Sequence, residues 1–263
     1  MRLKIMKVVI FAGGYGSRLG SITEMTPKPM VKIGGKPMIW HIMKIYSHYG
    51  IKEFVLCLGY KQDVIKEYFH NFNFLSSDFE IRLGGEKIKV LNHHDEIDWK
   101  ITLVDTGLNT LRGGRLKRVE KYLKGSVHMM TYGDGVADVD LKKLLMFHKS
   151  HKKILTVTGV YPPSRFGEIS EENSKVISFK EKPQVKSGVI NGGFFVFDKR
   201  IFKYLKDDEK CDLEKQVFEK LVSKGEVMVY RHLKNWACVD TERDLKYLNE
   251  VWETGNAFWK VWK

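Results

Sequence analysis

The first stretch whose residue types suggest chemistry is FAGGYGSRLG, which spans residues 11–20 directly after the apolar run KVVI. Glycine has no Cβ, so a cluster of glycines lets the backbone approach a ligand closely or adopt a positive φ. Gly13 and Gly14 suit close approach, and Gly16 suits a turn. The guanidinium of Arg18 can form two parallel hydrogen bonds with phosphate oxygens. The stretch predicts a phosphate-binding loop, and the alternative is an ordinary turn whose arginine faces solvent.

Two better-known glycine loops are excluded at this position. A P-loop needs the pattern GxxxxGK[ST], and Leu19 stands where its second glycine would be. A dinucleotide fingerprint needs GxGxxG, and the same leucine replaces its third glycine. The second apolar run is followed by GYKQ, without the acidic residue that binds a ribose hydroxyl in such folds. A dehydrogenase is therefore disfavoured.

Charged residues that could act on phosphates or metal ions follow later in the chain. Lys28 lies between two prolines in TPKPM, which predicts that a stiff, extended segment presents its ammonium group. Asp134 lies between two glycines in YGDG, where a carboxylate can reach a hard cation such as Mg²⁺. Asp240 precedes Thr241 and Asp244, whose spacing is typical of a helix capping box. Against the alternatives of a plain loop lysine and a tight turn, we interpret Asp134 and Asp240 as candidate metal ligands.

A third group of polar residues suits a sugar phosphate. FKEKP contains Glu181 and Lys182 just after a predicted strand, and INGGFFVF contains Asn191 followed by Gly192 and Gly193. Glutamate and asparagine suit sugar hydroxyls, and lysine suits the phosphate on the anomeric carbon. The two glycines would let the backbone approach a flat face of a ligand. Each feature is common by itself, so only their combination indicates a sugar-phosphate site.

These residues need a scaffold, and apolar runs that alternate with amphipathic segments predict one. We expect strands at residues 7–12, 53–59, 100–104, 127–132 and 154–160, and helices at residues 36–50, 61–69, 114–123, 139–149 and 243–252. Residues 79–92 resemble a hairpin, whereas 175–183 and 189–197 look like an antiparallel pair. The order of strands and helices favours an α/β fold with a parallel sheet covered on both faces. Sites in such sheets lie at the carboxyl ends of the strands, so we expect the glycine loop and GDG to be neighbours.

The composition allows one domain that covers residues 1–263. A hydrophobic content of 43% in 263 residues permits a large buried core. No apolar run approaches the roughly 20 residues that cross a bilayer, and the N-terminal MRLKI is too short and too charged for a signal peptide. Three widely spaced cysteines without a CxxC motif indicate neither a disulfide framework nor a zinc site. We expect a soluble, cytoplasmic protein with no membrane partner.

The charge has two interpretations. A formal net charge of +13 would by itself suggest a nucleic-acid partner. However, lysines are spread along the whole chain, and the densest runs, at 113–125 and 148–153, have the helical spacing of solvated helix faces. A basic surface equally suits an anionic small substrate such as a sugar phosphate or a nucleotide. We therefore expect no nucleic-acid partner.

Several motifs together resemble those of one family. AGGYGSRL, PKPM, GGKPMIWHIM, YGDG, FKEKP, NGGFFV and DTERD, in this order, resemble the sugar-1-phosphate nucleotidylyltransferases. Longer stretches such as TYGDGVADVD and GNAFWKVW look like the branch of that family that uses CTP and glucose 1-phosphate. The likeness covers the chain from Met6 onward. It implies a Rossmann-like mixed sheet with helices on both faces, Mg²⁺ as a cofactor and a homo-oligomer.

The resemblance also implies roles for individual residues. Asp134 and Asp240 match the magnesium carboxylates, and Arg18, Lys28 and Asp134 match groups at the reacting phosphates. Nucleotide contacts are implied for Phe11, Ala12, Gly13, Gly14, Tyr15, Gly16, Ser17, Arg18, Lys28, Thr106, Arg115 and Gly133. Sugar-phosphate contacts are implied for Gly167, Glu181, Lys182 and Asn191. The nucleotide-binding half would span about residues 6–135, and the sugar-phosphate half about residues 136–263.

The implied reaction transfers a cytidylyl group from CTP to α-D-glucose 1-phosphate and releases pyrophosphate. Cys238 and Val239 stand where the family has proline and methionine, and Ser17 stands where threonine is commoner, which leaves the nucleotide preference open. A related enzyme that uses UTP or dTTP is therefore an alternative. Two other classes are a glycosyltransferase, which would normally show a DxD-like motif, and a silent sensor, which should have lost Lys28, Arg18 or an aspartate.

Overall fold

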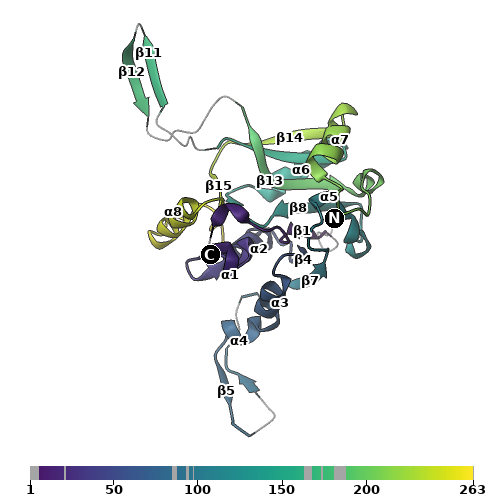
Figure 1. The fold of residues 1–263 in the computed structure, drawn as a ribbon, viewed down its shortest axis with the longest axis vertical. Coiled ribbons are helices and arrows are strands. Elements are labelled where there is room, and N and C mark those ends of the chain that lie inside the picture. Colours follow the sequence, from purple (N-terminus) through teal and green to yellow (C-terminus); the bar gives the residue numbers. More distant parts are fainter. Residues whose placement is uncertain are drawn as a thin grey trace.

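The computed structural model describes residues 6–20, 22–84, 88–92, 95–96, 98–162, 168–172, 174–180 and 188–262. Within these ranges its centre is a seven-stranded sheet in the order β14-β10-β13-β8-β1-β4-β7 (Figure 1). The strands are β1 (Val8–Phe11), β4 (Glu53–Leu58), β7 (Lys100–Asp105), β8 (Val127–Tyr132), β10 (Leu155–Val160), β13 (Ile190–Asp198) and β14 (Val227–His232). Neighbouring strands are parallel, except that β13 runs antiparallel to both β8 and β10. The predicted mixed sheet is confirmed.

Two hydrophobic cores cover the two faces of the sheet. Successive side chains of a strand point to opposite faces, so Val8 and Ile10 enter one core and Val9 and Phe11 enter the other. Helices that contribute to the first core are α2 (Met38–His48), α3 (Gln62–His70), α6 (Leu141–His151) and α8 (Glu242–Glu253). The second core includes α5 (Arg112–Arg118), α7 (Glu219–Ser223), a π-helix at Leu213–Phe218 and a 3₁₀ helix at Lys199–Tyr204. The predicted helices on both faces are also confirmed.

Short strand pairs flank the main sheet. β2 (Lys32–Ile33) pairs with β3 (Lys36–Pro37), and β9 (Gly135–Ala137) pairs antiparallel with β15 (Trp236–Cys238). The predicted hairpin is confirmed as β5 (Phe79–Ile81) and β6 (Ile88–Val90). The remaining short helices are α1 (Ile22–Met25), α4 (Phe72–Ser76) and a 3₁₀ turn at Glu120–Tyr122.

The antiparallel pairing predicted between residues 175–183 and 189–197 is wrong. The strand β12 (Lys175–Lys180) pairs instead with β11 (Glu168–Glu172). The strand β13 lies inside the main sheet, between β8 and β10. Its run from Gly193 to Phe197 is buried, so the apolar stretch gains more from the two-sided core than from a local hairpin partner.

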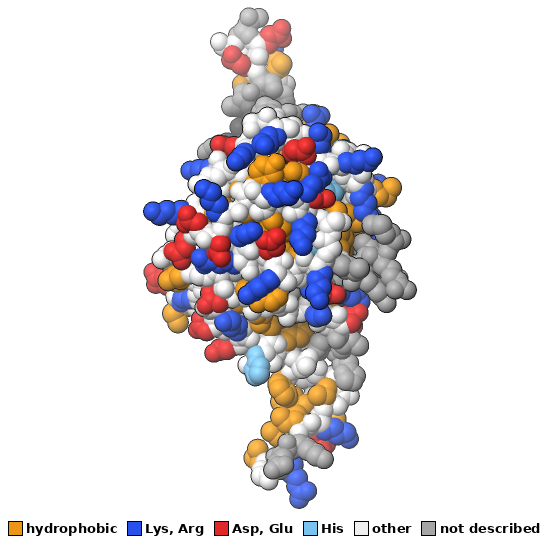
Figure 2. Space-filling model, turned by 90° about the vertical axis from the view of Figure 1, so that its right-hand side faces the viewer, with side chains coloured by type: hydrophobic (Ala, Val, Ile, Leu, Met, Phe, Trp, Pro, Cys, Tyr) orange, Lys and Arg blue, Asp and Glu red, His pale blue; other side chains and the backbone are white. Residues whose placement is uncertain are grey.

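Two arms extend from opposite ends of the molecule (Figure 1). One arm is formed by β11 and β12, and the other by α4 with the β5–β6 hairpin. The second arm exposes the apolar side chains of Phe74, Leu75, Phe79, Ile81, Leu83, Ile88, Val90 and Leu91. Figure 2 shows hydrophobic side chains gathered on this lower extension, whereas Lys and Arg are scattered among Asp and Glu over the main body. A contiguous exposed apolar surface of this kind is typical of an interaction site.

None of the helices in the described ranges combines the length and the apolar composition that a membrane crossing requires. Strands from both predicted halves share the main sheet, since β8 of the first half lies beside β13 of the second. The assignment of one half to the nucleotide and the other to the sugar phosphate stays a prediction.

Candidate active site at the ends of the central strands

The candidate site lies where the two central parallel strands β1 and β8 end. Phe11 and Tyr132 are partners in register, so the loops that follow them leave the sheet side by side. The predicted proximity of the glycine loop and GDG is confirmed. A cleft of about 460 Å³ opens here, and loop 108–112 forms another of its walls. The predicted residues that line it are Phe11, Ala12, Gly13, Gly14, Tyr15, Gly16, Ser17, Lys28, Arg115, Gly133, Asp134 and Asp240.

Lys28 joins the two candidate metal carboxylates. Its Nζ donates to Asp134 Oδ2 at 2.7 Å and to Asp240 Oδ1 at 2.6 Å. The predicted extended conformation of this segment is wrong, because Lys28 begins a 3₁₀ turn that ends at Met30. The backbone N–H of Met30 closes the turn by donating to the carbonyl of Pro27 at 2.7 Å. A short hydrogen-bonded turn, with proline on either side of the lysine, therefore presents the ammonium group.

The pairing of β9 with β15 brings Asp240 close to Asp134. The backbone N–H of Val239, just after β15, donates to the carbonyl of Asp134 at 2.8 Å. The predicted capping box is confirmed, since Thr241 caps α8 and the side chain of Asp244 accepts from the backbone N–H of Thr241. Asp240 is thus held between the end of a strand and the start of a helix.

The charges of this cluster act on its ionisable groups. Burial lowers the pKa of the Lys28 ammonium, but the charges and hydrogen bonds of Asp134 and Asp240 outweigh it and raise this pKa above 10.5. Burial, followed by the negative charges of Asp240 and Asp134, raises the pKa of the Cys238 thiol to about 12. Near neutral pH Lys28 is therefore a cation and Cys238 an uncharged thiol, which is a poor nucleophile.

The two aspartates fit a magnesium ion. Mg²⁺ prefers oxygen ligands and is usually held by one or two carboxylates, while waters and substrate phosphates complete its shell. Asp134 and Asp240 can reach a common cation, since a single ammonium bonds to both. In the part of the chain that the structure describes, no group of three or more His, Cys, Asp or Glu side chains could hold a metal ion.

Arg115 is 4% exposed and ties three loops together. Its two terminal nitrogens donate to the carbonyl oxygens of Leu58 (2.7 Å), Gly107 (2.8 Å), Gly13 (3.0 Å) and Leu108 (3.1 Å) and to the hydroxyl of Thr106 (2.8 Å). These acceptors follow or end the strands β1, β4 and β7. Burial lowers the pKa of the guanidinium, yet an arginine stays charged. A cation is therefore fixed beneath the glycine loop, and its direct contact with a nucleotide stays a prediction.

The arginine explains two of the glycines. A Cβ on Gly13 would lie 2.3 Å from Arg115 Nη1, and a Cβ on Gly59 would lie 2.6 Å from the same atom. A Cβ on Gly14 would meet nothing within 4 Å. Gly16 has a φ of 68°, which confirms its predicted turn. Gly13 thus makes room for a buried side chain, whereas close approach to a ligand stays a prediction for Gly14.

Other predicted residues lie at the edge of the site or outside the description. Thr106 is buried and donates to the carbonyl of Leu58 at 2.6 Å, and it does not line the cleft. Arg18 lies in the 3₁₀ turn Ser17–Leu19, which borders the cleft through Ser17. Its side chain lies outside the description, as do the residues Gly167, Glu181 and Lys182.

Sequence reasoning missed a polar network at another end of the cleft. The Tyr132 hydroxyl donates to Glu214 Oε1 at 2.6 Å and accepts from Asn191 Nδ2 at 2.8 Å. Arg112 Nη1 also donates to Glu214 Oε1, at 2.9 Å, and its guanidinium lies 4.7 Å from the centre of the Tyr132 ring. Burial and the charge of Glu214 raise the pKa of Tyr132 well above its usual range, so the hydroxyl stays protonated. The tyrosine beside GDG was the available signal, whereas nothing local marks Glu214, which lies 102 positions from Arg112.

The two glycines after Asn191 lie close to protein groups. A Cβ on Gly192 would lie 2.5 Å from Val160 Cγ1, and a Cβ on Gly193 would lie 2.8 Å from Tyr132 Cδ2. The strand β13 lies inside the sheet, with neighbours on both sides, and the approach of these glycines to a ligand stays a prediction. Asn191 itself does not line the cleft but is joined to it through Tyr132.

A side-chain bridge joins the glycine loop to the opposite wall of the cleft. The Tyr15 hydroxyl donates to Asn109 Oδ1 at 2.7 Å, and the Tyr15 ring centre lies 5.0 Å from that of Tyr60. The bridge therefore links the loop after β1 to the loop after β7.

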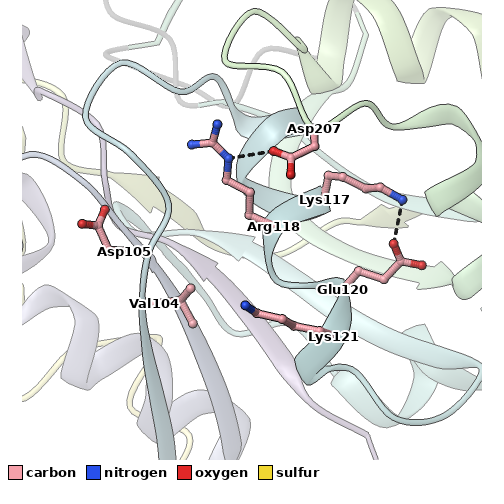
Figure 3. A pocket seen from close by; sticks show the side chains of 7 residues that line it. All are labelled: Val104, Asp105, Lys117, Arg118, Glu120, Lys121 and Asp207. Atoms are coloured by element: carbon pink, nitrogen blue, oxygen red, sulfur yellow. Dashed lines mark hydrogen bonds and ion pairs between the residues drawn. The ribbon is translucent and has the colours of Figure 1, made fainter.

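A larger hollow of about 620 Å³ lies between β7 and α5 (Figure 3). Lys117 pairs with Glu120, and Arg118 pairs with Asp207, so these charges are balanced within the hollow (Figure 3). Asp105 and Lys121 lie at its sides. Because the paired aspartates Asp134 and Asp240 and the ends of the central strands occur in the smaller cleft, we place the candidate active site there.

The sheet, the glycine loop and the paired aspartates define an enzyme that acts on phosphates. The family model for nucleotidyl transferases matches residues 7–260, and the chain belongs to this family. The glucose-1-phosphate cytidylyltransferase of Salmonella typhi is 46% identical over 260 residues, which cover 98% of this chain and 100% of that enzyme. The D-glycero-alpha-D-manno-heptose 1-phosphate guanylyltransferase of Campylobacter jejuni is 34% identical, over 89% of this chain and 90% of that enzyme. The resemblance predicted from the motifs is thereby confirmed.

The solved structures include a similar chain. The crystal structure of HddC from Yersinia pseudotuberculosis matches with a TM-score of 0.68 and 25% identity, over 94% of this chain and 99% of that chain. The likeness agrees with the predicted α/β fold.

Proposed function

We propose that the protein transfers a cytidylyl group from CTP to α-D-glucose 1-phosphate, giving CDP-glucose and pyrophosphate in the cytoplasm. The observation that carries the proposal is the cluster of Lys28, Asp134 and Asp240 beside the glycine loop. The choice of substrates is supported by the relative from Salmonella typhi, whose name states this activity. No nucleic acid or membrane takes part in the reaction.

The reaction is a displacement at phosphorus. A phosphate oxygen of glucose 1-phosphate forms a bond to the α-phosphorus of CTP, and the bond from that phosphorus to the β-phosphate oxygen breaks. The phosphate is already ionised near neutral pH, so no side chain has to act as a nucleophile. The main tasks of the protein are positioning and charge neutralisation.

The residues of the cleft divide these tasks. Lys28 stabilises the negative charge that grows on the departing pyrophosphate, together with Arg18 of the adjoining turn. The backbone from Phe11 to Gly16 holds the base and ribose above the fixed charge of Arg115. Lys182, Glu181, Gly167 and Asn191 hold the sugar phosphate.

Asp134 and Asp240 would hold Mg²⁺. A magnesium ion bound there would neutralise phosphate charge and so lower the repulsion between the two substrates. Without the ion, the two carboxylates would repel the phosphates, and the Lys28 ammonium offsets part of that charge.

The test is pyrophosphate release from four nucleoside triphosphates, each with several sugar 1-phosphates. Cytosine offers an amino donor and a ring-nitrogen acceptor, and a pocket built for them leaves buried groups unpaired when uracil binds. Each mispaired group costs about 1–3 kcal/mol, or roughly tenfold to a hundredfold in kcat/KM. We expect CTP to react fastest, UTP more slowly and the purine nucleotides negligibly. Equal or faster turnover with UTP or dTTP would replace the cytidylyl assignment by the alternative within the same family.

We also propose that the protein is a homo-oligomer. The apolar side chains on the α4–β6 arm support it, because a two-stranded hairpin is marginal in water unless another surface covers it. A second copy of the chain is the occupant we propose for this surface.

A further inference from the structure

Tyr132 is a rigid centre of hydrogen bonding in the cleft. Its hydroxyl has one donor bond, to Glu214, and one acceptor bond, from Asn191. Arg112 packs over its ring, and the backbone of Gly193 lies so close to the ring that no Cβ would fit there. The side chain therefore has little freedom to turn, and the groups bonded to its hydroxyl share its fixed position.

Glu214 presents one oxygen to the network, and its other oxygen has no partner in the described part of the chain. Both Tyr132 and Arg112 donate to Oε1, at 2.6 and 2.9 Å. Oε2 has no hydrogen-bond partner among the residues that the structure describes, and Glu214 lines the cleft. The guanidinium of Arg112 balances the carboxylate charge, while Asp212 caps the π-helix that carries Glu214 by accepting from its backbone N–H. The arrangement is a preorganised acceptor for which the described residues supply no further donor.

The chemistry of Oε2 determines the kind of group that can bind it. An ionised carboxylate only accepts hydrogen bonds, so it repels phosphate and attracts hydroxyl or amino donors. Both a sugar ring and cytosine carry such donors. The network continues from Tyr132 to Asn191 on β13, away from the glycine loop that we assign to the nucleotide. This direction favours the sugar ring over cytosine as the donor to Oε2.

We propose that Glu214, positioned by Tyr132 and Arg112, accepts a hydrogen bond from a hydroxyl of the sugar ring and thereby selects the sugar 1-phosphate. This assignment rests on the proposed function of the same cleft. It adds a specificity residue that no sequence motif marks.

The test is a panel of deoxyglucose 1-phosphates, each lacking one hydroxyl, assayed with the unaltered protein and with Glu214→Ala. We expect one deoxy analogue to lose roughly tenfold to a hundredfold in kcat/KM with the unaltered protein. Glu214→Ala should accept glucose 1-phosphate and that analogue about equally, because the hydroxyl no longer has a partner. An analogue preference that is unchanged by Glu214→Ala overturns the proposal, and so does an effect confined to the KM of CTP, which would place Oε2 at the base.

Two further variants separate binding from folding. Tyr132→Phe keeps the ring and removes only the hydroxyl, so it should raise the KM of glucose 1-phosphate while the circular dichroism spectrum and Tm stay close to normal. Glu219→Gln, on the exposed start of α7, is the matched control and should change neither KM. If Tyr132→Phe leaves the sugar KM unchanged, the positioning role is wrong.

The two proposals can fail separately. If the unaltered protein releases no pyrophosphate from CTP and glucose 1-phosphate, the proposed function fails. The deoxy panel then uses whichever nucleotide and sugar 1-phosphate react, and the loss of analogue discrimination in Glu214→Ala still decides the role of Glu214.

Discussion

Lys28 and Asp240 are separated by 212 positions in the chain, yet the Lys28 ammonium donates to Asp240 Oδ1 at 2.6 Å. The same ammonium donates to Asp134, so one cation lies between two carboxylates and reduces their mutual repulsion. The two aspartates are therefore a pair at one site, and loss of either should have a similar effect.

Asp134→Asn and Asp240→Asn should each lower kcat by about 10²- to 10³-fold, because each removes one preorganised electrostatic contact with the metal that both substrates share. The measurement is pyrophosphate release over a range of Mg²⁺ concentrations, with the Tm as a check on folding. Asp140→Asn is a matched control, since Asp140 caps α6 and asparagine caps a helix equally well. Near-normal turnover of either variant at limiting Mg²⁺ would show that its aspartate is not a metal ligand.

Lys28→Ala should chiefly lower kcat, because the charge that Lys28 stabilises grows in the transition state. Lys182→Ala should instead raise the KM of glucose 1-phosphate. Steady-state kinetics with each substrate varied in turn separates the two effects. A change of the same size in the CTP KM alone, for both variants, would contradict this division.

Gly13→Ala should damage the protein far more than Gly14→Ala. The new methyl group would lie 2.3 Å from Arg115 Nη1 at residue 13 but would meet nothing within 4 Å at residue 14. Overpacking of a filled site typically costs about 1–3 kcal/mol in the free energy of unfolding. Urea denaturation measures that cost, and the CTP KM should rise in the same variant. Equal stability of the two variants would argue against the arginine as the reason for the glycine.

Stability should fall as the pH falls from about 6.5 toward 4. Burial lowers the pKa of His41 from 6.5 to about 4, so the folded state binds fewer protons than the unfolded state in this window. The stabilising contribution of the neutral His41 ring is present above its pKa in the unfolded state and is lost as the pH falls toward its pKa in the folded state. In the neutral ring one nitrogen bonds to the carbonyl of Ile33 at 2.8 Å, and the other accepts from Trp259 Nε1 at 3.3 Å, so a second proton would break the latter bond.

The expected loss from His41 alone is about 2 kcal/mol between pH 7.5 and pH 5. Burial also lowers the pKa values of His128 and His148 to about 4, which adds a loss of the same sign. Urea denaturation at both pH values measures the sum. His41→Gln should reduce the slope, whereas the exposed His70→Gln should leave it unchanged. A free energy of unfolding that is constant from pH 7.5 to pH 5 would refute the prediction.

Charge placed on the α4–β6 arm should break the oligomer. Leu83 is 90% exposed and Leu75 is 66% exposed, so replacing both with Asp should change the free energy of unfolding of a single chain little. In an interface, the same replacement would bury two charges away from water, which costs free energy. Sedimentation should show more than one chain per particle for the unaltered protein and a single chain for the variant. Met146, 70% exposed on α6, offers a control position in Met146→Asp. A monomeric unaltered protein would refute the expectation.

The sequence was sufficient wherever the physical signal is local. The spacing of Thr241 and Asp244 predicts a helix start, because both hydrogen bonds of a capping box close within one turn. Apolar runs separated by amphipathic segments predict the strands β1, β4 and β8, because the side chains of each run must be buried against neighbouring layers. The order of motifs along the chain was enough to identify the family. The sequence alone also marks Lys28, Asp134 and Asp240 as candidate site residues.

Only the tertiary structure decided what the predicted residues touch. Arg115 bonds to protein carbonyls because the ends of β1, β4 and β7 converge around it, and no sequence motif predicts those bonds. No local motif predicts that Glu214 lines the cleft, because its partner Arg112 lies 102 positions away in the chain. The position of β13 between β8 and β10 overturned the predicted pairing of residues 175–183 with 189–197. Helix caps and strand periodicity depend on residues a few positions apart. Contacts across separations such as the 102 positions between Arg112 and Glu214 depend instead on the order of strands in the sheet, which is set by burial over the whole chain.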